Sequence, residues 1–242
     1  MVKIFYDGAD IIEKRDDLKN SSAKIEGYTT NSTFVAKHLE KKISPFVDSQ
    51  YENYAKTILM EIGNKPISFQ VISESIEDIE KDARQISSWG KNVYVKIPVV
   101  TPSGDSTVDL IRKLHGEGMK INVTTVYTHE QIQSLSGIFG DTPVIVSVFA
   151  GGLSDCGIDP INNMKYAVKT FAGKDNVEIL WAGCQRLLSI REAEWCGCDI
   201  VTVPWDVLRK HDRLDTNAHD ACVAKSKLFY DDAEDLALTH KK

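Results

Sequence analysis

Eight short apolar runs alternate with amphipathic stretches from one end of the chain to the other. The runs have the length of single buried strands and lie near residues 3–7, 25–30, 66–72, 93–99, 120–127, 143–149, 177–183 and 199–203. Apolar residues at helical spacing lie between them, at Ser32–Lys42, Ser49–Ile62, Ser75–Trp89, Ser106–Gly116, His129–Phe139, Asn162–Phe171 and Arg186–Trp195. Eight strand-then-helix units in 242 residues predict a closed (β/α)8 barrel, or TIM barrel, a fold that takes about 250 residues.

A doubly wound open sheet is the structural alternative to the barrel. That fold would have a glycine-rich phosphate-binding turn after its first strand, and the turn here reads Asp7-Gly8-Ala9-Asp10, which is not such a turn. We therefore expect a single barrel domain over residues 1–242. The barrel itself is predicted at about 1–211, and a helical extension at about 212–242.

Composition and charge exclude several classes of protein. Hydrophobic residues make up 42% of the chain, yet no run approaches the ~20 apolar residues of a membrane span, so no membrane partner is expected. Met1 leads straight into a strand-like segment without a signal sequence, which predicts a cytoplasmic location. The 29 basic and 35 acidic residues are spread along the chain, so no nucleic-acid partner is predicted. Five cysteines include a Cys196-Gly197-Cys198 pair, but no histidine or second pair stands at ligand spacing, so no metal site is predicted.

One lysine interrupts a run that otherwise has the pattern of a buried strand. In Val93–Val99 the valines and the isoleucine share one face, and Tyr94, Lys96 and Pro98 share the other. On an ordinary half-exposed strand Lys96 would be a charge in solvent. In a closed barrel, by contrast, the face that points away from the helices is the interior, and Lys96 would point inward.

The same inward face carries polar residues on other strands. Towards the carboxyl ends of the predicted strands we expect the following side chains to face the interior or to close the strand: Asp7, Thr30, Asn31, Ser68, Gln70, Asn122, Thr124, Ser147 and Phe149. A satisfied polar core would explain any one of them. It explains the set poorly, because valine, isoleucine and leucine normally fill a barrel core, and because barrel enzymes hold their chemistry at this end.

A lysine in such a site is a usable amine, since burial disfavours its charged form. It can attack a carbonyl to form a Schiff base, which serves as the electron sink for breaking or making an adjacent carbon–carbon bond, and no metal or organic cofactor is required. Aldol cleavage also needs a base, and Asp7 is the carboxylate of the set. Gln70 and Thr124 could hold the water of imine formation and hydrolysis, and Asn31 and Asn122 could bind substrate hydroxyls.

Six motifs together resemble the transaldolase family, in the short bacterial branch that includes the fructose 6-phosphate aldolases. They are Phe5-Tyr6-Asp7-Gly8-Ala9-Asp10, Gly27-Tyr28-Thr29-Thr30-Asn31, Ile67-Ser68-Phe69-Gln70-Val71, Asn92-Val93-Tyr94-Val95-Lys96-Ile97-Pro98-Val99, Asn122-Val123-Thr124 and Ser147-Val148-Phe149-Ala150-Gly151. The resemblance runs from about Lys3 to Leu236. It implies that Lys96 is the Schiff-base lysine, Asp7 the acid/base and Asn31 a hydroxyl ligand, with Gln70 and Thr124 at the catalytic water. It also implies a homo-oligomer in which the C-terminal helix reaches a neighbouring chain.

The departures from this family concern its phosphate site. The resemblance predicts an arginine where Gly152 stands, and a serine and a basic residue where Gly183 and Gln185 stand. An arginine fork to phosphate is a strong charge-assisted contact, and Arg186, one place along, could replace it only by turning in. We therefore expect a specialised Schiff-base aldolase or transaldolase whose substrate is an unphosphorylated, larger or differently charged sugar.

Two alternatives stay open at this point. One is ordinary transaldolase activity, moving dihydroxyacetone between sugar phosphates in the pentose phosphate pathway. The other is a non-catalytic binding protein on the same scaffold. Retention of Lys96, Asp7, Asn31, Gln70 and Thr124 argues against the second, because a binding protein has no need of a buried amine.

Overall fold

The chain closes into a barrel of eight parallel strands, as the alternation predicts. The computed structural model describes residues 1–40 and 49–239. Each strand pairs with its neighbours in sequence order, and β8 pairs with β1 to close the ring. The strands are β1 (Lys3–Asp7), β2 (Ile25–Thr29), β3 (Ile67–Gln70), β4 (Val93–Pro98), β5 (Ile121–Val126), β6 (Val144–Val148), β7 (Val177–Trp181) and β8 (Ile200–Pro204).

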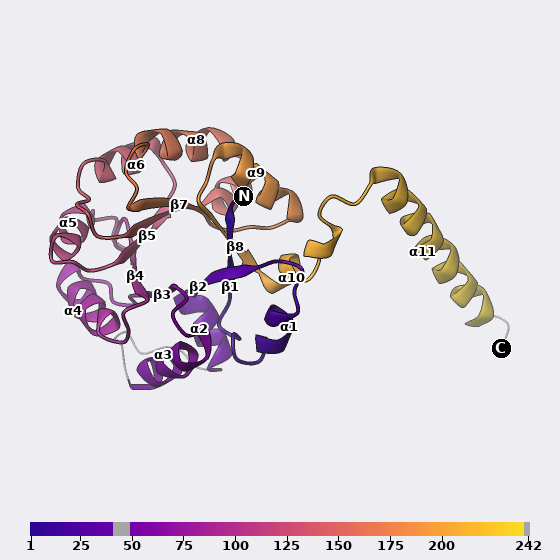
Figure 1. The fold of residues 1–242 in the computed structure, drawn as a ribbon, viewed down its shortest axis with the longest axis horizontal. Helices are drawn as coiled ribbons and strands as arrows, with labels where there is room; N and C mark the ends of the chain where they lie inside the picture. Colours follow the sequence, from indigo (N-terminus) through magenta and orange to yellow (C-terminus); the bar gives the residue numbers. More distant parts are fainter. Residues whose placement is uncertain (41–48, 240–242) are drawn as a thin grey trace.

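Helices surround the barrel, and one helix lies beyond it (Figure 1). They are α1 (Arg15–Lys19), α2 (Ser32–His38), α3 (Ser49–Ile62), α4 (Ile76–Ser87), α5 (Val108–Gly116), α6 (His129–Leu135), α7 (Ala150–Asp155), α8 (Ile161–Thr170), α9 (Leu187–Cys196), α10 (Trp205–Leu208) and α11 (Ala218–Thr239), with a short 3-10 turn at His211–Arg213.

The predicted strands are all present. Of the seven predicted helices, Ser49–Ile62 has the predicted bounds and the other six have shifted ends. The helix predicted at Ser32–Lys42 ends at His38, and residues 41 and 42 lie outside the described residues. The helix predicted to begin at Ser75 begins at Ile76, because the Ser75 hydroxyl caps it by accepting from the amide of Asp78. The short helices α1, α7 and α10 were not predicted.

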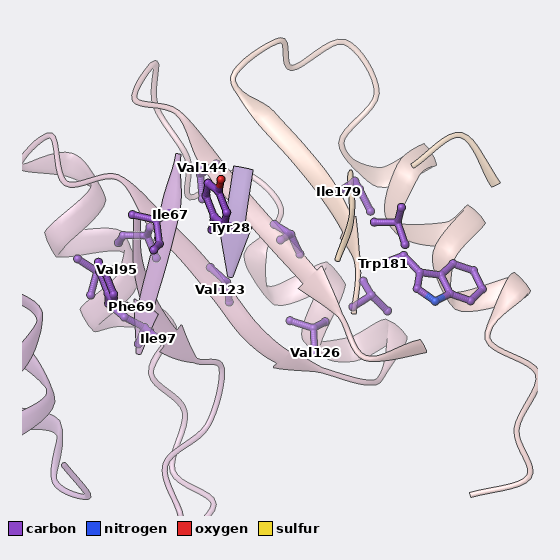
Figure 2. Close-up of a cluster of buried hydrophobic side chains, with 14 of the residues drawn as sticks. Tyr28, Ile67, Phe69, Val95, Ile97, Val123, Val126, Val144, Ile179 and Trp181 are labelled. Atoms are coloured by element: carbon purple, nitrogen blue, oxygen red, sulfur yellow. The ribbon is translucent and has the colours of Figure 1, made fainter. Parts of the chain in front are cut away.

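Side chains on the outer face of the strands and the inner faces of the helices form the main apolar core. Figure 2 shows part of it, with labelled side chains from β2 to β7 packed outside the barrel wall. The assignment of Ile67, Phe69, Val95 and Ile97 to this outer face is thus confirmed. It follows that the alternate residues of these strands face the barrel interior.

The interior is divided into an apolar and a polar layer. Phe5, Tyr94, Ile145 and Ile200 belong to one buried apolar cluster inside the barrel. Two residues further along each of the same strands stand Asp7, Lys96, Ser147 and Thr202. Since side chains two apart on a strand share a face, the polar layer lies directly above the apolar one, towards the carboxyl ends of the strands. This places it at the end of the barrel where enzymes of this fold hold their sites.

Helix α11 extends away from the barrel (Figure 1). Every side chain from Thr216 to Glu234 is exposed, including Val223, Leu228 and Phe229. Among the described residues, no helix is both long enough and apolar enough to cross a bilayer.

Candidate active site

Lys96 lies in the interior of the barrel, as its position in the strand pattern predicts. Its side chain is in β4 and the residue is only 6% exposed. Its Nζ donates to the carbonyl oxygen of Thr30, 3.1 Å away. Burial lowers the pKa of Lys96 from its ordinary value, and the carboxylate of Asp7 opposes that shift. Lys96 is therefore an amine whose neutral form is favoured more than that of a surface lysine.

Asp7 ends β1 in the same polar layer. Its Oδ1 accepts a 2.8 Å hydrogen bond from the hydroxyl of Thr29, which also contacts the hydroxyl of Thr202. Burial raises the pKa of Asp7, while Lys96 and the Thr29 hydrogen bond act to lower it. A carboxylate with a raised pKa is a better proton acceptor than an ordinary surface aspartate, which suits a general base.

A buried chain of hydrogen bonds crosses the interior beside Lys96. Asn122 is directly paired with Lys96 in the register of β4 and β5. Its Nδ2 donates to the hydroxyl of Ser68 at 2.9 Å, and its Oδ1 accepts from the hydroxyl of Ser147 at 2.7 Å. All three side chains are at most 1% exposed. The side chains of Asn122 and Ser147 thus have hydrogen-bond partners, as in a polar core. Either could bind a ligand only by giving up one of these hydrogen bonds for one to the ligand.

Thr124 and Gln70 flank Lys96 on the neighbouring strands. The Thr124 hydroxyl is fully buried and has no hydrogen-bond partner among the described residues. Gln70 pairs with Lys96 in the β3–β4 register and is half-buried, and its backbone is held on both sides by the hydroxyl of Tyr51. A buried hydroxyl without a partner is a place where a water or a substrate oxygen would be stabilised.

Thr125, next along β5, has a φ of 56°, a left-handed conformation that is unfavourable for a β-branched residue. The register of β5 against β6 shifts at this point, between Val123 and Val126. The Thr125 hydroxyl donates to the carbonyl oxygen of Thr124 at 2.7 Å. Strain of this kind, about 1–3 kcal/mol, is concentrated at functional sites.

Thr30 and Asn31 connect β2 to α2. The Thr30 hydroxyl donates to the carbonyl oxygen of Ser68 at 2.9 Å, so this turn is fixed against β3. Asn31 caps α2, because its Oδ1 accepts from the amide of Phe34 at 2.8 Å. Its Nδ2 group is then the part of the side chain left to contact a substrate hydroxyl.

The remaining predicted residues lie on the β6 and β7 side of the mouth. Phe149 is half-buried at the end of β6 and packs against the inner apolar cluster. The Arg186 guanidinium donates to Glu192 at 2.8 Å, and none of its hydrogen bonds in the described residues reaches the group around Lys96. Gln185 donates to the carboxylate of Asp155 at 2.9 Å. This corner therefore presents amide, carboxylate and glycine backbone, together with the 64% exposed side chain of Arg186, which lines the same cavity and donates one hydrogen bond to Glu192.

Two members of the polar layer were missed by sequence reasoning. Thr29 and Thr202 are 1% and 3% exposed and lie beside Asp7. The pattern of β8 contained the signal for Thr202, since Ile200 and Thr202 share a face. Thr29 had no such signal, because the β1–β2 register shifts between Ile4 and Phe5 and breaks the alternation.

Comparison with known proteins gives one family. The family model described as transaldolase/fructose-6-phosphate aldolase matches residues 4–241. A protein named "Probable transaldolase" from Sulfurihydrogenibium sp. (strain YO3AOP1) is 31% identical over 220 residues, covering 88% of this chain and 92% of the relative. One of the same name from Bdellovibrio bacteriovorus is 29% identical over 233 residues, covering 96% and 97%.

Among solved structures, thiamine phosphate pyrophosphorylase from Pyrococcus furiosus superposes with a TM-score of 0.55 at 10% identity, covering 87% of this chain and 91% of that one. At that identity the likeness shows the barrel fold alone.

Proposed function

The chain belongs to the transaldolase/fructose-6-phosphate aldolase family, and on that premise we propose that Lys96 is its Schiff-base lysine. The observation that carries the proposal is a buried amine with a lowered pKa, placed beside a carboxylate with a raised pKa at the carboxyl end of the barrel. Desolvation maintains the neutral, nucleophilic form of Lys96, which the reaction consumes.

The steps follow from the positions of these side chains. The neutral Nζ of Lys96 attacks the ketose carbonyl carbon to form a carbinolamine, which takes up one proton and loses water to give the iminium ion. Asp7 takes the proton of the hydroxyl on the carbon two places from the iminium carbon, the bond between that carbon and the intervening carbon breaks, and its electron pair moves into the iminium to form an enamine. The leaving fragment departs as an aldehyde. The enamine then attacks an acceptor aldehyde in a transaldolase, or is protonated on carbon and hydrolysed in an aldolase.

Water enters and leaves at the imine carbon, and we assign its position to Thr124 and Gln70. Support comes from the buried Thr124 hydroxyl, which lacks a partner among the described residues. A water bound to the Thr124 hydroxyl would satisfy its hydrogen bonding. Thr124 is in β5, the strand paired with the β4 strand of Lys96. Asn31, Thr30 and the Asn122–Ser147 pair are proposed to line the sugar, and Phe149 to close its apolar side.

We further propose that the substrate is a sugar without a phosphate ester at the β6–β7 corner. Gly152, Gly183 and Gln185 provide no positive charge there, and the exposed guanidinium of Arg186, which lines the same corner, is shared with the carboxylate of Glu192. Phosphate recognition normally uses charged donors, each worth about 1.5–3 kcal/mol. Ordinary transfer between sugar phosphates is the competing activity, and it would require Arg186 to turn from Glu192 towards the phosphate.

The test is intact mass after sodium borohydride reduction, with fructose 6-phosphate, fructose and dihydroxyacetone offered separately. Wild type should gain the mass of the reduced adduct, and Lys96→Ala should not. Lys120→Ala is the matched control, because Lys120 lies at the surface and donates to the carbonyl oxygen of Lys91. Labelling by unphosphorylated ketoses in preference to fructose 6-phosphate would support the altered substrate. The opposite preference would support ordinary transaldolase activity, and no adduct in any case would favour a non-catalytic protein.

Helix α11 is proposed to pack on another copy of the chain. Support comes from its exposed apolar side chains, including Leu228, Phe229 and Tyr230, which would otherwise remain in water. In a chain that ends at Leu214 the oligomer should dissociate. The particle mass measured by light scattering should then fall by more than the mass of the residues removed from each copy. An unchanged number of copies would contradict this role of α11.

A further inference from the structure

Tyr127 is held in place at the mouth of the barrel by contacts on three sides. It follows β5 directly, and its backbone amide donates to the Oε1 of Gln131 at 2.8 Å. Its carbonyl oxygen accepts from the side-chain amide of Asn163. Its ring lies beside that of Phe149, with centroids 5.6 Å apart and planes inclined by 32°. The backbone of Tyr127 is therefore held by α6 and α8, and its ring packs beside Phe149 at the end of β6.

This ring covers Gly152. A Cβ built on Gly152 would lie 2.2 Å from the Tyr127 hydroxyl oxygen, 2.7 Å from Cζ and 2.8 Å from Cε1. No side chain fits at position 152 while Tyr127 keeps this position. Gly152 and Tyr127 are consequently one structural unit, in which the tyrosine occupies the space that a longer residue at 152 would need.

The Tyr127 hydroxyl has no hydrogen-bond partner among the described residues, although the residue is half-buried. Burial raises its pKa, and the neighbouring Cys156 and Asp155 raise it further. The hydroxyl therefore stays protonated and can donate or accept one hydrogen bond. Near this corner the carboxylate of Asp155 accepts from Gln185, and the charge of Arg186 is balanced by Glu192. A neutral hydroxyl is well matched to this environment, and a phosphate dianion would be repelled by the carboxylate.

We propose that Tyr127 is a specificity-determining residue that hydrogen-bonds an uncharged hydroxyl at the far end of the substrate and fills the space a phosphate-binding side chain would need. The inference rests on the proposed Schiff-base function, because it concerns the far end of the sugar bound to Lys96. The substrate class it names is unphosphorylated polyhydroxy ketoses and aldehydes.

The experiment compares rates of borohydride-trapped adduct formation at low concentrations of fructose, fructose 6-phosphate and dihydroxyacetone. Dihydroxyacetone lacks the carbons at the far end of the sugar, away from the carbonyl. Its labelling rate therefore reports on adduct formation at Lys96 without any contact to Tyr127. Tyr127→Phe keeps the ring and loses the hydroxyl, so fructose labelling should fall roughly three- to tenfold, the value of one net hydrogen bond. Dihydroxyacetone labelling should not change. The double variant Tyr127→Ala with Gly152→Arg should label with fructose 6-phosphate at least about tenfold faster than wild type, since it has both room and charge.

Three results would overturn the assignment of Tyr127 alone: unchanged fructose labelling in Tyr127→Phe, an equal loss with dihydroxyacetone, or a wild-type preference for fructose 6-phosphate. Each of these leaves adduct formation at Lys96 intact. Absence of any adduct in wild type would instead overturn the proposed function, and the assignment of Tyr127 with it. Thermal unfolding of each variant separates these outcomes from misfolding, and Tyr127→Phe should unfold within about 2 °C of wild type because one unpaired surface hydroxyl contributes little.

Discussion

Gly151 joins the two loops on the β6 and β7 side of the mouth, and a single added methyl group should separate them. A Cβ on Gly151 would lie 2.1 Å from the carbonyl oxygen of Gly183, and 2.8 and 2.9 Å from that residue's carbonyl carbon and Cα. Real Cβ atoms essentially never approach within 3.0 Å, so Gly151→Ala must move the two segments apart by about 1 Å. The Gly151 amide also donates to the carbonyl oxygen of Ala182, which limits the movement.

The cost follows from the kind of atoms in contact. Overpacking costs about 1–3 kcal/mol, and the upper end applies here because the contacted atoms are backbone and cannot rotate away. For a chain of this size, about 3 kcal/mol corresponds to a fall in melting temperature of roughly 6–12 °C. Gly183 itself has a φ of 74°, so its own segment has little freedom to adapt.

The assay is calorimetry together with borohydride labelling. Gly116→Ala is the matched control, because a Cβ at that exposed position in α5 meets nothing within 4 Å. Because Gly116 is the last residue of α5, this variant should stabilise the protein by less than about 0.5–1 kcal/mol, the gain for glycine in a helix interior. Labelling of Gly151→Ala by fructose should fall more than labelling by dihydroxyacetone, since the moved loops lie at the far end of the sugar. If Gly151→Ala melts within about 2 °C of wild type, the close contact does not constrain this corner and the reasoning is refuted.

Two further predictions concern the polar layer. The attacking form of Lys96 is the neutral amine, which accumulates as pH rises through its pKa, so the pH midpoint of dihydroxyacetone trapping should lie below the ordinary lysine value of 10.5. Asp7→Asn removes the charge that opposes this shift and should move the midpoint to still lower pH; an upward movement would contradict the pairing. Ser147→Ala leaves the buried Oδ1 of Asn122 without its donor and should cost about 2 kcal/mol, or roughly 4–8 °C by calorimetry. Ser134→Ala, at an exposed helical serine, is its control and should change the free energy of unfolding by less than about 0.5 kcal/mol, so equal effects of the two serine variants would be inconsistent with the buried chain.

The barrel and the polar face were predictable because both follow from periodicity. A period of two identified the outer face at Val95 and Ile97, and the inner position of Lys96 followed once the sheet was closed. The helices α7 and α10 were not predictable on the same basis. The first contains Gly151 and Gly152 in a six-residue helix, and the second has four residues, so neither has the propensity or length to form without tertiary packing.

The fine structure of the β6–β7 corner could not be predicted from local sequence either. Gly152 alone indicates only that a side chain is missing. Which neighbour occupies the space depends on where Tyr127 lies, and its backbone is held by Gln131 and Asn163 while its ring packs beside Phe149. Arg186 likewise could turn either way from the start of α9, and its pairing with Glu192, six residues further on, is not evident from local sequence.

Three locally unfavourable features converge at the carboxyl ends of β4 and β5. Lys96 is an amine in a buried layer, the Thr124 hydroxyl is buried without a partner in the described chain, and Thr125 has a positive φ. A polar core without a function would be expected to avoid all three, since valine or isoleucine would fill the same positions at lower free energy. Folds retain such departures where a ligand relieves them, and an imine at Lys96 with a water at Thr124 would relieve two of the three. The physical cost of the site therefore supports a ligand site at this end of the barrel independently of family membership.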